Sequence, residues 1–120
     1  MRLGRKITGG KYHKFRKKKL HAKKTQERIV ILGETKSKII KTRGGNYKPV
    51  LLTTNIANLT INGKTERAKI TNVLETPQNS FFARQNRLNK GVIIETDKGK
   101  AKITNRPSQE GQVNAIILEK

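Results

Sequence analysis

The sequence predicts a mainly β protein: a small antiparallel β-barrel of about six to seven short strands, preceded by a basic, extended N-terminal arm. Three observations lead to this fold class. Ile, Val and Thr make up 27 of the 92 residues from 29 to 120, and Leu only seven. β-branched side chains favour pleated strands over helices. Turn-forming residues separate the apolar segments every 8–14 residues, a spacing typical of a small barrel or sandwich. The first 28 residues instead carry a net charge of +11.

The N-terminal segment, residues 1–27, is expected to be an arm that is disordered when free. Through residue 28 the chain holds 12 Lys and Arg side chains and one acid, Glu27, and its seven apolar residues are too scattered to build a core. Ordering the backbone costs about 1–2 kcal/mol per residue, which so little apolar burial does not offset. We therefore expect residues 28–120 to form the barrel domain by themselves.

Two short strands are expected directly after the arm. The first, 28–32, ends at Gly33, and the second, 38–43, ends at the pair Gly44-Gly45. Glycine in a strand interior has no side chain to pack and costs backbone entropy, so it marks strand ends and turns.

A longer pair of strands follows. The run 50–61 is long for one strand and is expected to bend or bulge in its middle. Asn62-Gly63 then predicts a type I′ hairpin turn, because both residues tolerate the positive φ that this turn requires. In the return strand, 64–74, apolar residues alternate with charged ones, which indicates a strand buried on one face.

The remaining residues continue this pattern with one interruption. Residues 77–86 contain two adjacent phenylalanines and are expected to make one helical turn. Strands are then expected at 92–96, 100–104 and 113–118. A turn at 97–99 and a loop at 106–111 connect them, since both segments are rich in turn-forming residues.

Composition excludes several classes of protein. The chain has no Cys, and its two His, His13 and His21, have no carboxylate beside them, so no metal site is expected. With no Trp, no nucleotide-binding fingerprint and no nucleophile–base pair, we expect no cofactor, no small-molecule substrate and no enzymatic activity. The longest apolar runs are four residues, whereas a membrane helix needs about 20, so no membrane span is expected.

A net charge of +20 on 120 residues indicates a polyanionic partner, because a charge of this size repels itself in the compact state. Nucleic acid is the commonest such partner. In the arm, Tyr12 and Phe15 precede four basic residues at 16–19. The basic side chains could bind RNA or DNA phosphates, and the aromatic rings could stack on unpaired bases. A solubilising or nuclear-localisation tail is the competing interpretation, which the positive barrel domain disfavours.

Two glycine pairs, Gly9-Gly10 and Gly44-Gly45, would let backbone N–H groups approach a phosphate closely. For Gly44-Gly45 an ordinary turn is an equally good interpretation, and the two interpretations are compatible.

Several blocks of the sequence, taken in order, match a known family: Arg5-Lys6-Ile7-Thr8-Gly9-Gly10, the cluster 16–19, Thr42-Arg43-Gly44-Gly45-Asn46, Phe82-Ala83-Arg84 and Arg106-Pro107. Over nearly all of its length the chain resembles the ribosomal protein S8e family of archaeal and eukaryotic small subunits. Residues 20–24 depart from the family pattern. The chain also lacks the large insertion of eukaryotic members and so resembles the archaeal proteins in size.

The resemblance implies a small β-barrel with a basic extension and a non-enzymatic role. The chain would be a structural constituent of the small ribosomal subunit in the cytoplasm, where it binds and stabilises small-subunit rRNA and thereby supports translation. Its partners would be that RNA and neighbouring small-subunit ribosomal proteins, and it would not form a homo-oligomer. A ribosome-assembly factor of the same superfamily and a DNA-binding protein are the competing hypotheses.

The residues expected to contact RNA come from the arm and from basic and turn residues of the barrel domain. In the arm they are Arg2, Arg5, Lys6, Thr8, Gly9, Gly10, Lys11, Tyr12, Lys14, Phe15, Arg16, Lys17, Lys18, Lys19, Lys23 and Lys24. In the barrel domain they are Arg43, Gly44, Gly45, Asn46, Lys48, Arg84, Arg87, Lys90 and Arg106.

Overall fold

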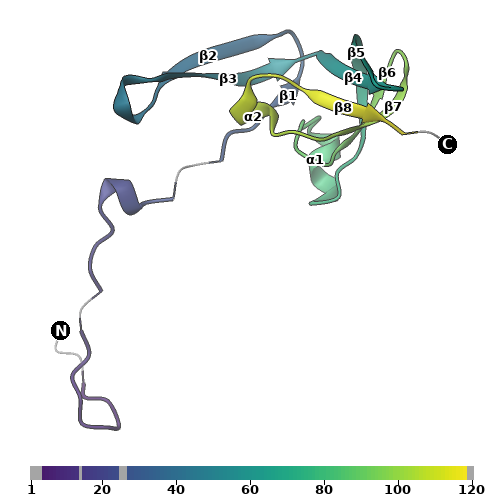
Figure 1. The fold of residues 1–120 in the computed structure, drawn as a ribbon. Helices are drawn as coiled ribbons and strands as arrows, with labels where there is room; N and C mark the ends of the chain where they lie inside the picture. Colours follow the sequence, from purple (N-terminus) through teal and green to yellow (C-terminus); the bar gives the residue numbers. More distant parts are fainter. Residues whose placement is uncertain (1–3, 14, 25–26, 119–120) are drawn as a thin grey trace.

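The computed structural model describes residues 4–13, 15–24 and 27–118. Figure 1 shows a folded body from which the N-terminal segment extends as a long arm, and the molecule measures 67 × 37 × 26 Å along its principal axes. Every residue described between 4 and 24 is exposed, and the first buried residue of the described chain is Val30. The described residues of the arm therefore contribute nothing to the hydrophobic core, which agrees with the scattered apolar residues of this segment.

The predicted barrel is present, and five strands close it (Figure 1). Consecutive strands pair antiparallel, whereas the last strand closes the barrel by pairing in parallel with the first, with Leu59 opposite Ala115. The parallel pair follows from the odd number of strands. Each antiparallel connection reverses the chain, so the first and fifth strands run the same way. The strands are β4 (Ile56–Ile61), β5 (Lys64–Glu75), β6 (Ile93–Thr96), β7 (Gly99–Ile103) and β8 (Asn114–Ile117).

A second sheet of three strands adjoins the barrel. Its strands are β1 (Ile31–Leu32), β2 (Lys36–Lys41) and β3 (Tyr47–Thr54). β2 and β3 form an antiparallel hairpin, and β1 pairs in parallel with β3 on its other edge. The strands predicted before residue 55 thus lie outside the closed barrel, which explains why it has fewer than six strands. A strand is predicted at 28–32, but the observed strand β1 contains only the last two of these residues.

The expected bend in the run 50–61 is a break between the two sheets. β3 ends at Thr54 and β4 begins at Ile56. The hydroxyl of Thr54, which is buried, accepts a hydrogen bond from the N–H of Ile56 at 3.2 Å. The carbonyl of Asn55 accepts one from the N–H of Ile70 in β5 at 2.8 Å. These bonds satisfy the backbone where the chain leaves one sheet for the other.

The hairpin between β4 and β5 has the predicted turn. Asn62 and Gly63 have φ angles of 48° and 80°, which confirms a type I′ turn. The predicted alternation of β5 is also confirmed, since Ala68 and Ile70 are buried and Lys69 between them is exposed.

One hydrophobic core joins the two sheets. Leu59 in β4 and Ile94 in β6 are fully buried, and they belong to the same cluster as Val30 before β1 and Leu51 in β3. Leu88, in the connection before β6, is fully buried in this cluster as well. The three-stranded sheet therefore packs as part of the barrel domain.

Two one-turn helices connect the strands. α1 (Ser80–Arg84) confirms the expected helical turn, and the side chain of Asn79 caps it by accepting a hydrogen bond from the N–H of Phe81 at 3.0 Å. α2 (Pro107–Glu110) lies where a loop is expected, and that expectation is wrong. The buried Pro107 stands at the start of α2, where its fixed φ suits a helix and its missing N–H has no helical partner to lose.

Candidate nucleic-acid interface

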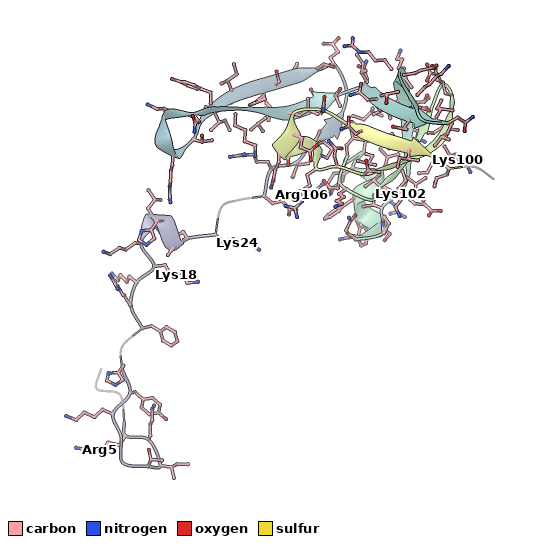
Figure 2. The ribbon with its side chains drawn as sticks, viewed as in Figure 1. Arg5, Lys18, Lys24, Lys100, Lys102 and Arg106 are labelled. Atoms are coloured by element: carbon pink, nitrogen blue, oxygen red, sulfur yellow. The ribbon has the colours of Figure 1, made fainter. Side chains whose placement is uncertain are left out.

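Positive charge on the described surface is almost unpaired. Within residues 4–13, 15–24 and 27–118, a single ion pair joins Lys98 and Glu66 on the barrel. Unpaired charges of one sign create a potential that attracts a polyanion. Figure 2 labels six basic residues along the arm, where the arm meets the body, and on the barrel: Arg5, Lys18, Lys24, Arg106, Lys100 and Lys102.

The glycine pair of the arm closes a small turn. The N–H of Lys6 donates to the carbonyl of Gly10 at 2.9 Å, and Arg5 and Lys11 form an isolated antiparallel bridge. The Nζ of Lys6 lies 5.6 Å from the centroid of the exposed Tyr12 ring. The turn thus places the Lys6 cation near one exposed aromatic ring, and Arg5 and Lys11 pair within the same turn. Phosphate binding and base stacking need these groups.

The other predicted arm residues form no compact site within the described segments. Residues 15–19 have no regular secondary structure before a 3₁₀ turn, η1 (Leu20–Ala22), and each predicted arm residue that the structure describes is exposed. Such side chains are free to follow a phosphate surface. They are Phe15, Arg16, Lys17, Lys18, Lys19 and Lys23, whereas the exposed Thr8 and Gly9 lie within the turn closed by Lys6 and Gly10. Two further predicted contacts, Arg2 and Lys14, lie outside the described residues.

Where the arm joins the folded body, an open groove of about 720 Å³ lies between the arm, β3, α1 and α2. We name it the basic groove after its five basic lining residues, which are Lys24, Arg28, Lys48, Lys90 and Arg106. One acid, Glu27, also lines it. The sequence predicts four of the five basic residues as separate contacts, and the structure brings them together. Arg28 is missed because the sequence assigns it to a strand.

Polar and aromatic side chains complete the basic groove. Phe82 of α1 contributes its half-buried ring, and the amides Gln78, Asn89 and Gln109 and the hydroxyl of Ser108 surround the remaining space. The Nε2 of Gln78 donates to the carbonyl of Lys90 at 2.6 Å. Sequence reasoning missed these residues because uncharged side chains add nothing to a charge count and come from separated segments.

The second glycine pair forms the tip of the β2–β3 hairpin. Arg43, Gly44 and Gly45 make a 3₁₀ turn, η2 (Arg43–Gly45). The N–H and the hydroxyl of Thr42 donate to the carbonyl of Asn46 at 2.7 and 2.9 Å and close the tip. The turn interpretation of Gly44-Gly45 is therefore confirmed. All residues of the tip are exposed, so contact with RNA stays a prediction.

The two remaining predicted contacts belong to α1 and the segment after it. Arg84 is exposed, with its guanidinium carbon 5.9 Å from the centroid of the Phe81 ring. Arg87 is half-buried, and its guanidinium carbon lies 4.2 Å from the centroid of the Phe82 ring. Arg87 thus stacks on an aromatic ring of the same molecule, while Arg84 projects from the surface.

The barrel has a further pair of exposed basic residues that are not among the predicted RNA contacts. Exposed and buried residues alternate in β7: Lys100 and Lys102 are exposed, whereas Ala101 and Ile103 are buried in the core. The alternation that identifies the strand also places these lysines outside, so that signal was available in the sequence.

The described segments hold no cluster of three or more His, Asp or Glu side chains that would suit a metal ion. Among the helices of those segments, none is long and apolar enough to cross a membrane.

Comparison with known proteins identifies the family of this chain. A model of the family described as "Ribosomal protein S8e" matches residues 1–118. The chain is 42% identical over 120 residues to the small ribosomal subunit protein eS8 of Haloarcula marismortui, covering 98% of this chain and 96% of the relative. It is 43% identical over 120 residues to the protein of that name from Methanococcus aeolicus, covering 95% and 91%. The family prediction is confirmed, and the chain belongs to the ribosomal protein S8e family.

Proposed function

We propose that this chain is a structural constituent of the small ribosomal subunit, and that it binds and stabilises the small-subunit rRNA through its arm and the basic surface of its barrel domain. It works in the cytoplasm as a single copy per subunit, beside neighbouring small-subunit ribosomal proteins. Membership in a family of structural ribosomal proteins means that the chain is not an enzyme, as the sequence predicts.

The division of the charge supports this proposal most strongly. The first 28 residues carry +11 and the remaining 92 carry +9, and one ion pair is present among the described residues. The arm exposes all its described side chains, so folding alone leaves its charge uncompensated. RNA phosphates would neutralise both parts, and the extended arm would reach surfaces that the barrel does not.

The copy number in mature subunits separates a structural protein from an assembly factor. Subunits purified from cells and washed in high salt should retain about one copy of the chain per particle. A chain that is abundant on precursor particles and absent from mature ones would instead be an assembly factor.

A competition experiment distinguishes an rRNA-binding protein from a DNA-binding protein. The full chain should bind small-subunit rRNA more tightly than duplex DNA of equal length. If it makes about 6–10 phosphate contacts, its affinity should fall by roughly 10³–10⁵ between 50 and 200 mM salt. Equal affinity for both nucleic acids would contradict the rRNA assignment and favour a DNA-binding protein.

A further inference from the structure

We propose that the basic groove captures one unpaired nucleotide of the rRNA, with its phosphate held by the surrounding lysines and arginines and its base stacked on the Phe82 ring. This inference rests on the proposed function. It adds one base-recognition site to an interface that otherwise consists of phosphate contacts.

The size of the basic groove suits a nucleotide. Its volume of about 720 Å³ lies within the roughly 300–1,000 Å³ of small-ligand clefts. A concave space of this size admits a nucleotide that has left the helix stack, whereas a base-paired helix is too wide to enter. Proteins that recognise RNA bases usually bind such unstacked nucleotides, because the deep groove of A-form RNA hides its base edges.

The charge of the groove suits a phosphate. Its lining has five basic side chains and one acid, Glu27. The single ion pair among the described residues joins Lys98 and Glu66, neither of which lines the groove. Lys48 is half-buried there, so its side chain lies partly against the wall of the groove. An RNA phosphate would supply the missing negative charge and form charge-assisted hydrogen bonds with these groups.

Phe82 supplies a stacking surface whose position is already fixed. The guanidinium carbon of Arg87 lies 4.2 Å from the ring centroid, and the N–H of Arg87 donates to the carbonyl of Phe82 at 3.1 Å. Because Phe82 lines the groove and Arg87 does not, the base would lie on the ring surface turned away from Arg87. A base on that surface would continue a stack of guanidinium and ring, at little cost in side-chain ordering.

The amide side chains give the groove the means to recognise a base edge. Because the Nε2 of Gln78 donates to the carbonyl of Lys90 at 2.6 Å, its Oε1 is held in place as an acceptor. Asn89 and Gln109 also line the groove, and each amide offers both a donor and an acceptor. Phosphate binding alone needs no such groups, whereas unpaired bases present donors and acceptors that amides can bind.

Two neighbouring phenylalanines provide a matched pair of variants. Phe82→Leu removes the ring that lines the groove, and Phe81→Leu removes a ring that is 63% exposed and does not line it. We would bind the full chain to full-length small-subunit rRNA and measure chemical modification of each unpaired base. The wild-type protein and Phe81→Leu should protect at least one base that Phe82→Leu leaves reactive. Phe82→Tyr, which keeps the ring, should restore protection. Loss of one base stack should weaken RNA binding about tenfold.

The possible outcomes separate this inference from the proposed function. If wild-type protein does not bind the rRNA, the proposed function fails and the inference with it. If Phe82→Leu binds with the footprint of the wild-type protein, the inference alone is overturned. If Phe82→Leu does not fold, the double variant Asn89→Ala/Gln109→Ala is measured in its place. Loss of the same base protection would support nucleotide binding in the groove. An unchanged footprint would overturn the inference.

A free nucleotide has the same chemistry as a nucleotide within RNA, so a further measurement separates the two. The four nucleoside monophosphates at millimolar concentration should leave the rRNA footprint of the wild-type protein unchanged. Binding of a monophosphate to the free chain that Phe82→Leu abolishes, together with an rRNA footprint that Phe82→Leu leaves unchanged, would identify the groove as a site for free nucleotides and overturn the inference.

Discussion

The guanidinium carbon of Arg87 lies 4.2 Å from the centroid of the Phe82 ring, and the two residues are also joined by a backbone hydrogen bond of 3.1 Å from the N–H of Arg87. A cation at this distance is attracted to the face of the ring. The stack fixes the one aromatic side chain that lines the basic groove. Arg87, which the sequence suggests as an RNA contact, therefore has a structural role that can be measured separately.

Replacing Arg87 by Met should reduce stability, because Met keeps much of the apolar stem but removes the cation over Phe82. A partly desolvated pair of this kind contributes about 1–2 kcal/mol, so the free energy of unfolding in urea should fall by about that amount. Arg84→Met is the control. Its guanidinium carbon is 5.9 Å from the largely exposed Phe81 ring, and its effect should be smaller. Equal losses would show that the Arg87 stack adds no stability.

Replacing Asn105 by Ala should destabilise the connection that contains α2. The buried Asn105 side chain donates to Glu110 Oε2 at 2.9 Å and to the carbonyl of Gln112 at 2.8 Å, and it accepts from the N–H of Asn114 at 3.0 Å. Its removal leaves two part-buried bonding partners, the carbonyl of Gln112 and the N–H of Asn114, without this side chain, so thermal or urea unfolding should show a loss of about 2–4 kcal/mol. Asn79→Ala, which removes a single capping bond, should cost only about 1 kcal/mol.

Gly111 combines a left-handed backbone with a close neighbour. Its φ is 75°, and a Cβ there would lie 3.4 Å from Cγ of Pro49 in β3. Gly45 has a similar φ of 78° and no atom within 4 Å of such a Cβ. Gly45→Ala should therefore cost about 1–2 kcal/mol through backbone strain, and Gly111→Ala more, because it also crowds the contact between α2 and β3. Equal costs in urea unfolding would mean that Pro49 moves aside freely.

Deleting residues 1–24 should leave the melting temperature of the barrel domain nearly unchanged, because no described residue of that segment is buried. RNA binding should weaken strongly, since residues 1–24 carry the whole net charge of +11 found in the first 28 residues. Affinity measured at several salt concentrations should show a salt slope smaller by about one unit for each phosphate contact removed. The double variant Lys100→Gln/Lys102→Gln should reduce the slope far less. An unchanged affinity after deletion would make the barrel the main anchor.

Replacing Arg43 by Ala tests the tip of the β2–β3 hairpin. Arg43 is exposed, and the hydrogen bonds that close the tip come from Thr42 and Asn46, so the melting temperature should not change. RNA affinity should fall about tenfold if the guanidinium binds a phosphate, since charge-assisted hydrogen bonds contribute about 1.5–3 kcal/mol. A lower melting temperature with unchanged affinity would assign the tip a purely structural role.

Local features of the sequence predicted local structure well. The turn at Asn62 and Gly63, the burial of Ala68 and Ile70 in β5, and the helical turn of α1 all follow from residues adjacent in the chain. The helix α2 was not predicted, because turn-forming residues also suit a one-turn helix. A buried Pro107 and the hydrogen bonds of Asn105 select the helix, and both depend on packing.

The β-strand content, the barrel class, the basic N-terminal segment and the family all follow from the residues alone. The conformational preferences of single residues and the alternation of apolar side chains act over a few residues, and a charge count needs no structure. The three-dimensional fold was needed to show that the chain changes sheets at Asn55 and that β8 closes the barrel in parallel with β4. It was also needed to show that one groove brings Phe82 together with the basic residues Lys24, Lys48, Lys90 and Arg106. These outcomes depend on contacts between distant segments. The chain must close its barrel and bury its common core before residues so far apart in sequence can line one site.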